Sequence, residues 1–235
     1  MCGRFTLTNP DPRRLAMRYS IGGDLELDER PRFNIAPTDP VLAVRGRADG
    51  DRDLGRLRWG LVPGAWAESG RPLINARSET VASQPAFAEP FRERRCLIPA
   101  DGFYEWRHDP DGKQPIWISR PERELFSFAG IWTEHRTRQG ETLSSCAIIT
   151  CDPNELMAEI HDRMPVILPP EVESEWLAPD ADVERLRELM APLPADRLET
   201  REVSDSVNDA RADGPELLEP PMKLFERPLP CRARG

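Results

Sequence analysis

The sequence predicts an α+β fold: one domain of mainly antiparallel β-sheet, with an open, barrel-like core and a few flanking helices. Three observations support this prediction. The 235-residue chain contains 25 prolines and 15 glycines, which divide it into short segments. Most of these segments are brief apolar runs bounded by turn residues, as is typical of strands. Helix signals occur at only three places. We expect a single domain over residues 1–235, with a core at about 1–208 and a C-terminal tail at about 209–235.

The predicted strands follow one another along the chain. An Asp-Gly pair favours a tight turn between strands, and such pairs occur at Asp49-Gly50, Asp101-Gly102 and Asp111-Gly112. The first of them indicates a hairpin between its two neighbouring strands. The predicted strands are Cys2–Leu7, Val41–Arg45, Leu57–Leu61, Arg95–Pro99, Phe103–Arg107, Ile116–Ser119, Leu125–Thr133, Ser145–Thr150 and the short Glu202–Val207.

Two of the helices are predicted from a capping aspartate. Asp11 precedes Pro12–Tyr19, in which proline occupies the first position, where its missing N–H costs nothing. Asp182 precedes the second helix, Val183–Met190. An aspartate side chain at this position accepts a hydrogen bond from the free N–H groups of the first turn.

The third helix is predicted at Pro153–Ile160. Asp152 is its expected cap, Pro153 fits its first position, and an acidic residue lies three positions after the cap. Leu156 and Ile160 are one turn apart, so we expect them to form the buried face.

Charge is unevenly distributed. The net charge is −9, but residues 1–120 carry +2 and residues 121–235 carry −11. A phosphate-binding surface is therefore expected in the first half. No apolar run approaches the roughly 20 residues that span a bilayer, and the N-terminus lacks the pattern of a secretory signal. We predict a cytoplasmic monomer without a membrane partner. Five cysteines, an odd number, argue against a disulfide framework.

The second residue is the strongest chemical signal. If Met1 is removed, Cys2 carries a free α-amine beside its thiol. An α-amine has a pKa of about 7.7–8.0, so about a tenth is the neutral nucleophile at pH 7, and the thiol is expected to add a few per cent of thiolate. Such a 1,2-aminothiol can capture an aldehyde as a Schiff base and then close a thiazolidine ring. The alternative is that Cys2 is a small residue packed in the core.

Three further residues combine an ionisable or amide group with rigid surroundings. Asn75 lies in the segment Leu73–Thr80, and Glu105 is flanked by two aromatic residues. Against an apolar wall, the pKa of Glu105 would rise toward neutrality and suit proton transfer. His161 stands between a predicted helix end and a proline. The alternatives are a surface ion pair for Glu105 and a helix C-cap for His161. Metal binding is not expected, because no CxxC pair occurs and the cysteines have no histidine at ligand spacing.

Together these segments resemble the SOS-response-associated peptidase (SRAP) domain family. The resemblance spans about residues 1–208 and follows the order of the family's motifs. Those motifs are Met1-Cys2-Gly3-Arg4-Phe5, Arg32–Thr38, Trp59–Trp66, Ile74–Thr80, Arg95–Trp106, His161-Asp162-Arg163-Met164-Pro165 and, weakly, Val203–Asn208. The resemblance implies an SRAP-like fold and a sensor of abasic sites in single-stranded DNA. It also implies a thiazolidine crosslink between the N-terminal cysteine and the open-chain sugar aldehyde.

The resemblance also implies roles for individual residues. Cys2 would be the nucleophile, and Asn75 would position its amine and the sugar. Glu105 would shuttle protons, and His161 would help to open the sugar ring or act as the base in a lyase reaction. No cofactor is implied, and DNA binding would place the protein at the nucleoid. The implied DNA-binding residues are Arg4 and Arg77 on phosphates, with Asn34, Pro37, Trp66, Trp106 and Thr150 shaping the strand groove.

Trp66 and Trp106 suit the groove because stacking of bases on an aromatic ring tolerates any sequence. The alternative for both tryptophans is core packing. The family commonly has a second aromatic residue just before Trp66, where this chain has Ala65. This difference bears on the strength of stacking and not on the chemistry.

Two other functions remain open. An N-terminal-nucleophile amidohydrolase of the glutaminase type also begins with Met-Cys-Gly and uses the same amine as the base for its thiol. A non-catalytic module that binds single-stranded DNA would not need Cys2 at all. Autocleavage of Met1 is conceivable, whereas a true protease is not expected.

Overall fold

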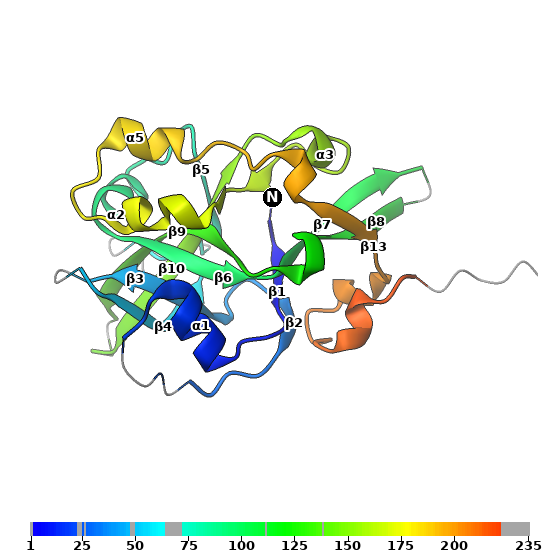
Figure 1. The fold of residues 1–235 in the computed structure, drawn as a ribbon, viewed down its shortest axis with the longest axis horizontal. Coiled ribbons are helices and arrows are strands. Elements are labelled where there is room, and N and C mark those ends of the chain that lie inside the picture. Colours follow the sequence, from blue (N-terminus) through cyan, green and yellow to red (C-terminus); the bar gives the residue numbers. More distant parts are fainter. Residues whose placement is uncertain are drawn as a thin grey trace, which may run out of the picture.

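The structure is a computed structural model, and it describes residues 2–22, 25, 27–47, 50–63, 72–110, 112–137 and 139–221. Two β-sheets pack together, with short helices at their margins (Figure 1). The strand-rich architecture confirms the predicted α+β class.

The first sheet closes on itself. Its pairings run from β10 to β4, β3, β6 and β9, and β9 pairs back with β10. The core is therefore a closed ring of strands and not the open barrel that the sequence predicts. The pairs are antiparallel except where β10 meets β4 and β5. The strands of this sheet are β3 (Pro40–Gly46), β4 (Arg52–Trp59), β5 (Asn75–Arg77), β6 (Arg95–Ala100), β9 (Phe126–Arg136), β10 (Thr142–Cys151), β11 (Met164–Pro165) and β12 (Ile167–Leu168).

The second sheet lies across one side of this ring, and its order is β13-β8-β7-β1-β2. Its strand β1, which lies between β7 and β2, joins the two sheets. Phe5 of β1 packs edge-on against Trp59 and Phe128 of the first sheet, with ring centroids 5.2 and 5.6 Å apart. The strands are β1 (Arg4–Leu7), β2 (Arg32–Ile35), β7 (Gly102–Asp109), β8 (Gly112–Ser119) and β13 (Glu199–Glu202).

Five short helices in the described part of the chain flank the sheets. Asp11 caps α1 by accepting from the Arg14 N–H, and Asp182 caps α5, as the sequence predicts. The helices are α1 (Pro12–Tyr19), α2 (Ala88–Glu93), α3 (Glu155–Ala158), α4 (Glu173–Leu177) and α5 (Val183–Glu188), with 3₁₀ turns at Pro121–Arg123, Pro170–Val172, Ala195–Arg197, Asp205–Asn208 and Pro215–Leu218.

The third predicted helix needs correction. It is shorter than predicted, and Asn154 caps it by accepting from the Met157 N–H. Asp152 is not the cap, because its carboxylate pairs with Arg163. The residue that this helix buries fully is Met157, while Leu156 and Ile160 are half-buried.

The predicted strand Glu202–Val207 is also wrong in its bounds. The strand ends at Glu202, and the chain then turns into a 3₁₀ segment. The Asp49 and Asp111 turn residues lie outside the described residues, although β3 and β4 form the predicted antiparallel hairpin.

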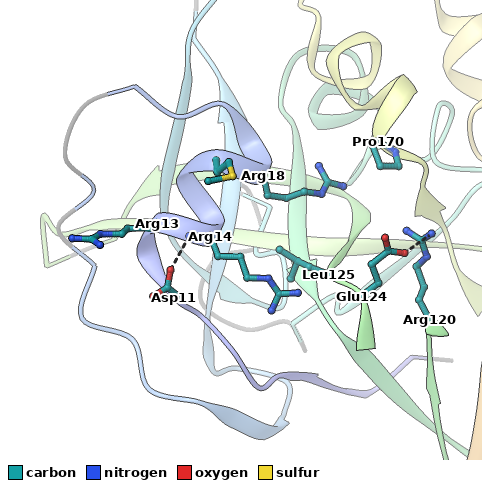
Figure 2. A pocket seen from close by; sticks show the side chains of 9 residues that line it. Asp11, Arg13, Arg14, Arg18, Arg120, Glu124, Leu125 and Pro170 are labelled. Carbon is teal, nitrogen blue, oxygen red and sulfur yellow. Dashed lines mark hydrogen bonds and ion pairs between the residues drawn. The ribbon is translucent and has the colours of Figure 1, made fainter. Parts of the chain in front are cut away.

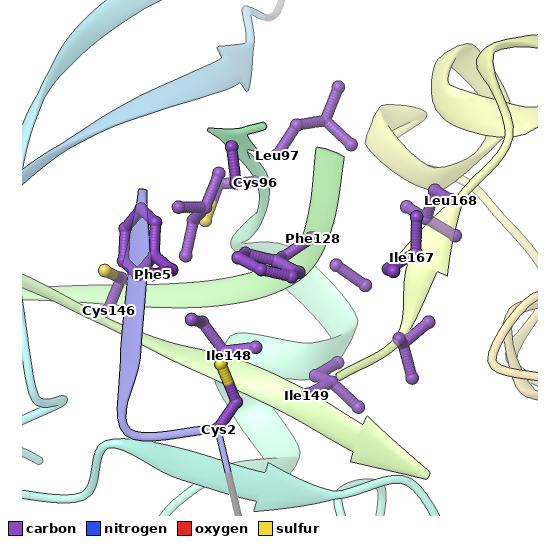
Figure 3. Packing of buried hydrophobic residues seen from close by; sticks show 14 of the residues in the cluster. Cys2, Phe5, Cys96, Leu97, Phe128, Cys146, Ile148, Ile149, Ile167 and Leu168 are labelled. Atoms are coloured by element: carbon purple, nitrogen blue, oxygen red, sulfur yellow. The ribbon is translucent and has the colours of Figure 1, made fainter. Parts of the chain in front are cut away.

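Two clusters of buried side chains hold the fold together. The larger one fills the first sheet and includes Cys2, Phe5 and Phe128 (Figure 3). The smaller one, around Tyr104 and Trp117, lies on the other face of the second sheet. Side chains alternate across a strand. Phe103 of β7 accordingly belongs to the larger cluster and Tyr104 to the smaller one.

Gly102 is a position where a side chain has no room. A Cβ atom there would lie 2.3 Å from Nε1 of the buried Trp117. We expect Gly102→Ala to lower the free energy of unfolding by about 1–3 kcal/mol or more, because overpacking forces the core apart. Urea unfolding measures the change. Gly22→Ala is the matched control, since nothing lies within 4 Å of its Cβ position. Equal stability of Gly102→Ala and the wild type would contradict the packing seen here.

Candidate active site

Cys2 lies two residues before β1 and is fully buried. Its thiol lies 4.0 Å from the Arg4 carbonyl oxygen. Burial, together with the negative charge of Glu105, raises the pKa of the thiol far above its ordinary value. The prediction that a few per cent of the Cys2 thiol is thiolate is therefore wrong, because the raised pKa leaves a much smaller fraction ionised. Chemistry at Cys2 must begin from a neutral thiol and needs a nearby proton acceptor.

Asn75 of β5 contacts Cys2 directly. Its Nδ2 donates to the Cys2 carbonyl oxygen at 2.9 Å. Parallel pairing of β5 with β10 fixes the position of this side chain, because Asn75 lies opposite Ile148. The Asn75 Oδ1 atom is buried and accepts no hydrogen bond from any described residue. A buried acceptor of this kind suits an N–H donor at the N-terminal residue.

Glu105 of β7 has an environment that changes its protonation. Only 2% of the residue is exposed. Burial raises its pKa to about 7, because the charged carboxylate loses hydration. The prediction that the pKa of Glu105 rises toward neutrality in apolar surroundings is thus confirmed. The alternative, a surface ion pair for Glu105, is excluded by its burial. Near neutral pH the side chain is available both as an acid and as a base.

His161 follows α3 and lies next to Glu105, with Nε2 3.9 Å from Glu105 Oε2. Its Nδ1 accepts from the Arg163 N–H at 3.0 Å, so the proton of the neutral ring is on Nε2, facing Glu105. Partial burial lowers the pKa of His161 and favours this neutral form. A protonated ring would pair instead with exposed Asp162, 2.8 Å from Nδ1.

Arg163 holds the His161 loop in place, a role that sequence reasoning missed. Its guanidinium binds both oxygens of Glu79, the Asp152 carboxylate and the Thr150 carbonyl oxygen. Hydrogen bonds from Arg163 lower the pKa of Glu79 to about 2. Glu79 follows β5, so this clamp links the histidine side of the site to the asparagine side. The only available signal was the presence of Arg163 in the His161–Pro165 motif.

A hydrogen bond, an electrostatic effect and a 3.9 Å approach thus link Cys2, Asn75, Glu105 and His161. They come from four separate segments: the start of β1, β5, β7 and the turn after α3. Cys2 touches Asn75, Glu105 acts electrostatically on the Cys2 thiol, and His161 adjoins Glu105. The cluster supplies two nucleophile positions on one residue, together with groups that can donate and accept protons.

Some predicted DNA-binding residues lie beside this cluster. Thr150 pairs in register with Arg77 across β10 and β5, and the Arg77 side chain is exposed. The Thr150 side chain is fully buried, and its hydroxyl has no partner among the described residues. Pro37 is half-buried. Trp66 lies outside the described residues.

Arg4, Asn34 and Trp106 are placed differently. Arg4 donates to Asn34 Oδ1 and to the Val207 carbonyl oxygen, at 3.0 and 2.9 Å. Asn34 is fully buried and donates to three carbonyl oxygens between residues 207 and 212. The Trp106 indole donates to Asn208 Oδ1 at 2.8 Å. The side chains of all three attach the 207–212 segment to the second sheet, and their part in DNA binding stays a prediction.

Two features are absent from the described residues. Within them, no group of three or more His, Cys, Asp or Glu side chains is arranged to hold a metal ion. Nor is any helix in this part of the chain long and apolar enough to cross a membrane.

Known proteins resemble this chain over most of its length. The abasic site processing protein YoqW of Bacillus subtilis (strain 168) is 44% identical over 225 residues, which cover 93% of this chain and 99% of YoqW. The abasic site processing protein YedK of Escherichia coli is 33% identical and covers 94% of this chain and 100% of its own. The abasic site processing protein HMCES of Gallus gallus is 33% identical, covering 81% of this chain and 66% of its own.

Solved structures agree with this likeness. The crystal structure of a protein from Bacteroides thetaiotaomicron superposes with a TM-score of 0.79 at 25% identity, covering 93% of this chain and 99% of its own. A phage-related protein of Bordetella bronchiseptica gives a TM-score of 0.69 at 32% identity, with coverages of 86% and 94%. The model of the SOS response associated peptidase (SRAP) family matches residues 1–210. The chain therefore belongs to the SRAP family.

Proposed function

We propose that this protein processes abasic sites in single-stranded DNA and forms a thiazolidine crosslink through Cys2 once Met1 is removed. The observation that carries the proposal is the contact of Asn75 with Cys2 in a buried cluster that also contains Glu105 and His161. Relatives named abasic site processing proteins support the choice of DNA lesion. An abasic sugar in its open form carries the aldehyde that an aminothiol captures.

The amine begins the reaction. The Asn75 Oδ1 accepts one N–H of the Cys2 amine and turns its lone pair toward the sugar carbonyl. Attack forms the C–N bond and moves the carbonyl electrons onto oxygen, which takes a proton. Loss of that oxygen as water gives the Schiff base. Glu105 is suited to these steps, because a group with a pKa of about 7 exists in both protonation states near neutrality.

The thiol completes the ring. The C–S bond forms as sulfur attacks the Schiff-base carbon, and the electrons of the C=N bond move onto nitrogen. The S–H proton passes to nitrogen, so the thiazolidine forms without a net change in protons. A buried, neutral thiol needs a base for this transfer. The Glu105 carboxylate serves as that base, because its charge already acts on the thiol in the folded protein.

His161 is placed to open the sugar ring. Its Nε2 carries the proton of the neutral ring and faces Glu105. This N–H gives its proton to the ring oxygen as the C–O bond breaks, while the Glu105 carboxylate takes the proton of the anomeric hydroxyl, whose oxygen becomes the aldehyde oxygen, and passes that proton to Nε2. The same imidazole can remove a sugar proton in a lyase reaction. The exposed Arg77 at the edge of the cluster holds a flanking phosphate.

Intact mass spectrometry with an abasic oligonucleotide tests the proposal. We expect the purified chain to lack Met1 and to gain the mass of the oligonucleotide minus one water. The adduct should survive a denaturing gel. An undamaged oligonucleotide of the same sequence is the control. Ammonia release from glutamine without any DNA adduct would instead support an amidohydrolase. DNA binding without a covalent product would support a non-catalytic binding module.

A further inference from the structure

A pocket of about 510 Å³ lies between α1 and the segment that leads into β9. It is far from the Cys2 cluster along β1: Cys2 precedes the strand, whereas α1 follows its other end (Figure 1). Its floor and walls include the apolar Met17, Leu125 and Pro170. Figure 2 shows the Arg14 side chain reaching toward Leu125, with Arg120 on the far side. The pocket thus combines an apolar surface with cationic groups.

The arginines of this pocket have few partners of their own. Within the described part of the chain, no hydrogen bond or ion pair involves the side chain of Arg13 or Arg14. Arg120 pairs with Glu124, whose side chain is 60% exposed. The buried Nε–H of Arg120 has no acceptor among the described residues. Exposed ion pairs contribute little to stability, so an incoming carboxylate can compete for Arg120. Arg18, in contrast, is fully engaged by buried Glu173.

Two further observations indicate a binding surface. Met17 is 83% exposed, and it is the only large hydrophobic residue that is exposed among the described residues. Methionine adapts its shape readily and is common at surfaces that bind peptides. Glu122 and Arg123, just before Glu124, both have a φ of 54°. Consecutive left-handed backbone at non-glycine residues is strained, and such strain concentrates at ligand sites.

We propose that this pocket binds an acidic peptide segment of a partner protein, in which carboxylates flank an apolar side chain. The carboxylates would pair with Arg14 and Arg120, and the apolar side chain would pack against Met17 and Leu125. Charge complementarity favours this occupant, because the side chains of Arg13 and Arg14 make no ion pair with any described residue. None of the described lining residues is aromatic, so the pocket has no ring on which a DNA base could stack.

The position of the pocket separates this contact from the chemistry. A partner bound at α1 leaves the opposite end of β1 open to a DNA strand. The ion pair of Arg18 with Glu173 attaches α1 to the start of α4. The inference does not depend on the proposed crosslink, because no residue of the Cys2 cluster lines the pocket.

Fluorescence anisotropy with a labelled pentapeptide, in which two aspartates precede and two follow a central leucine, tests the proposal. We expect saturable binding that weakens with salt. Arg14→Glu should weaken binding at least about tenfold, because it reverses a charge at the pocket rim. The substitution leaves α1 intact, since glutamate is favoured in the first turn. Met17→Ser should weaken binding through the apolar contact alone.

Arg92→Glu is the matched control, because Arg92 is an exposed arginine on α2 that does not line the pocket. It should bind the peptide within about twofold of the wild type, and all three variants should crosslink abasic DNA normally. Absence of saturable binding, or equal affinity of Arg14→Glu and the wild type, overturns the proposal. So does competition by an undamaged oligothymidylate whose own binding is lost in Arg14→Glu, which would make the pocket part of a DNA surface.

Discussion

Replacing Cys2 with alanine is expected to abolish the stable adduct with abasic DNA. Cys2→Ala keeps the terminal amine and the contact of the main-chain carbonyl with Asn75, but removes the sulfur. The amine can still form a Schiff base, which water reverses, while ring closure has no nucleophile. We expect at least a 10²-fold loss of product that survives heat and denaturant, measured on a gel after incubation with an abasic oligonucleotide.

Two controls make this prediction specific. Borohydride reduction should restore a covalent product with Cys2→Ala, because it traps the Schiff base through the remaining amine. Cys146→Ala removes another fully buried thiol from the same core and should crosslink like the wild type. A heat-stable adduct of undiminished yield with Cys2→Ala, without reduction, would show that the ring does not involve Cys2.

Local signals predicted much of the fold. Asp11 and Asp182 cap their helices because a capping hydrogen bond spans only two or three residues. The β3–β4 hairpin likewise depends on neighbouring segments. Asp152 shows where this reasoning ends: the sequence gives it the position of a cap, but Arg163, 11 residues later, binds its carboxylate, and Asn154 takes over.

Local sequence patterns could not predict which distant strands pair with one another. Closure of the first sheet requires β10 to pair with β9 on one side and with β4 and β5 on the other. The three-residue strand β5 is too short to show an alternating pattern, and it exists because it adds to β10. No periodicity within either segment specifies the partner, so a ring could not be distinguished from an open sheet.

For the candidate site, the identity of the residues could be predicted from the sequence, but their burial could not. Residue types and the family resemblance selected Cys2, Asn75, Glu105 and His161, and the structure gathers all four. Burial could not be predicted from composition, and it reverses the expectation for the Cys2 thiol. The same burial gives Glu105 its raised pKa. The hydrogen bonds of Arg4 and Asn34 to the Val207 carbonyl oxygen could not be predicted, because this partner lies more than 170 positions away in sequence.

Replacing Glu105 with glutamine is expected to slow crosslinking by about 10²–10⁴-fold, the usual contribution of a positioned acid or base. Glutamine preserves the shape of the side chain but can neither gain nor lose a proton. The wild-type rate should also change with pH around a midpoint near 7, where the protonation of Glu105 changes. This dependence should disappear in Glu105→Gln. Single-turnover crosslinking rates from pH 5 to 9 test both expectations.

Glu105→Gln should lower the crosslinking rate but raise the free energy of unfolding at high pH. Burial raises the pKa of Glu105 from 4.5 to about 7, so between these values the folded protein binds more protons at this site than the unfolded chain. The contribution of Glu105 to the free energy of unfolding therefore falls as pH rises through this window, by about 3 kcal/mol in total. Glu105→Gln has no such loss of stability. In urea unfolding, the free energy of unfolding of Glu105→Gln relative to the wild type should therefore be higher at pH 8 than at pH 5. Glu199→Gln, at an exposed residue, is the matched control and should change neither quantity. A slow variant that is also destabilised at pH 8 would indicate that Glu105 supports the fold and does not transfer the proton.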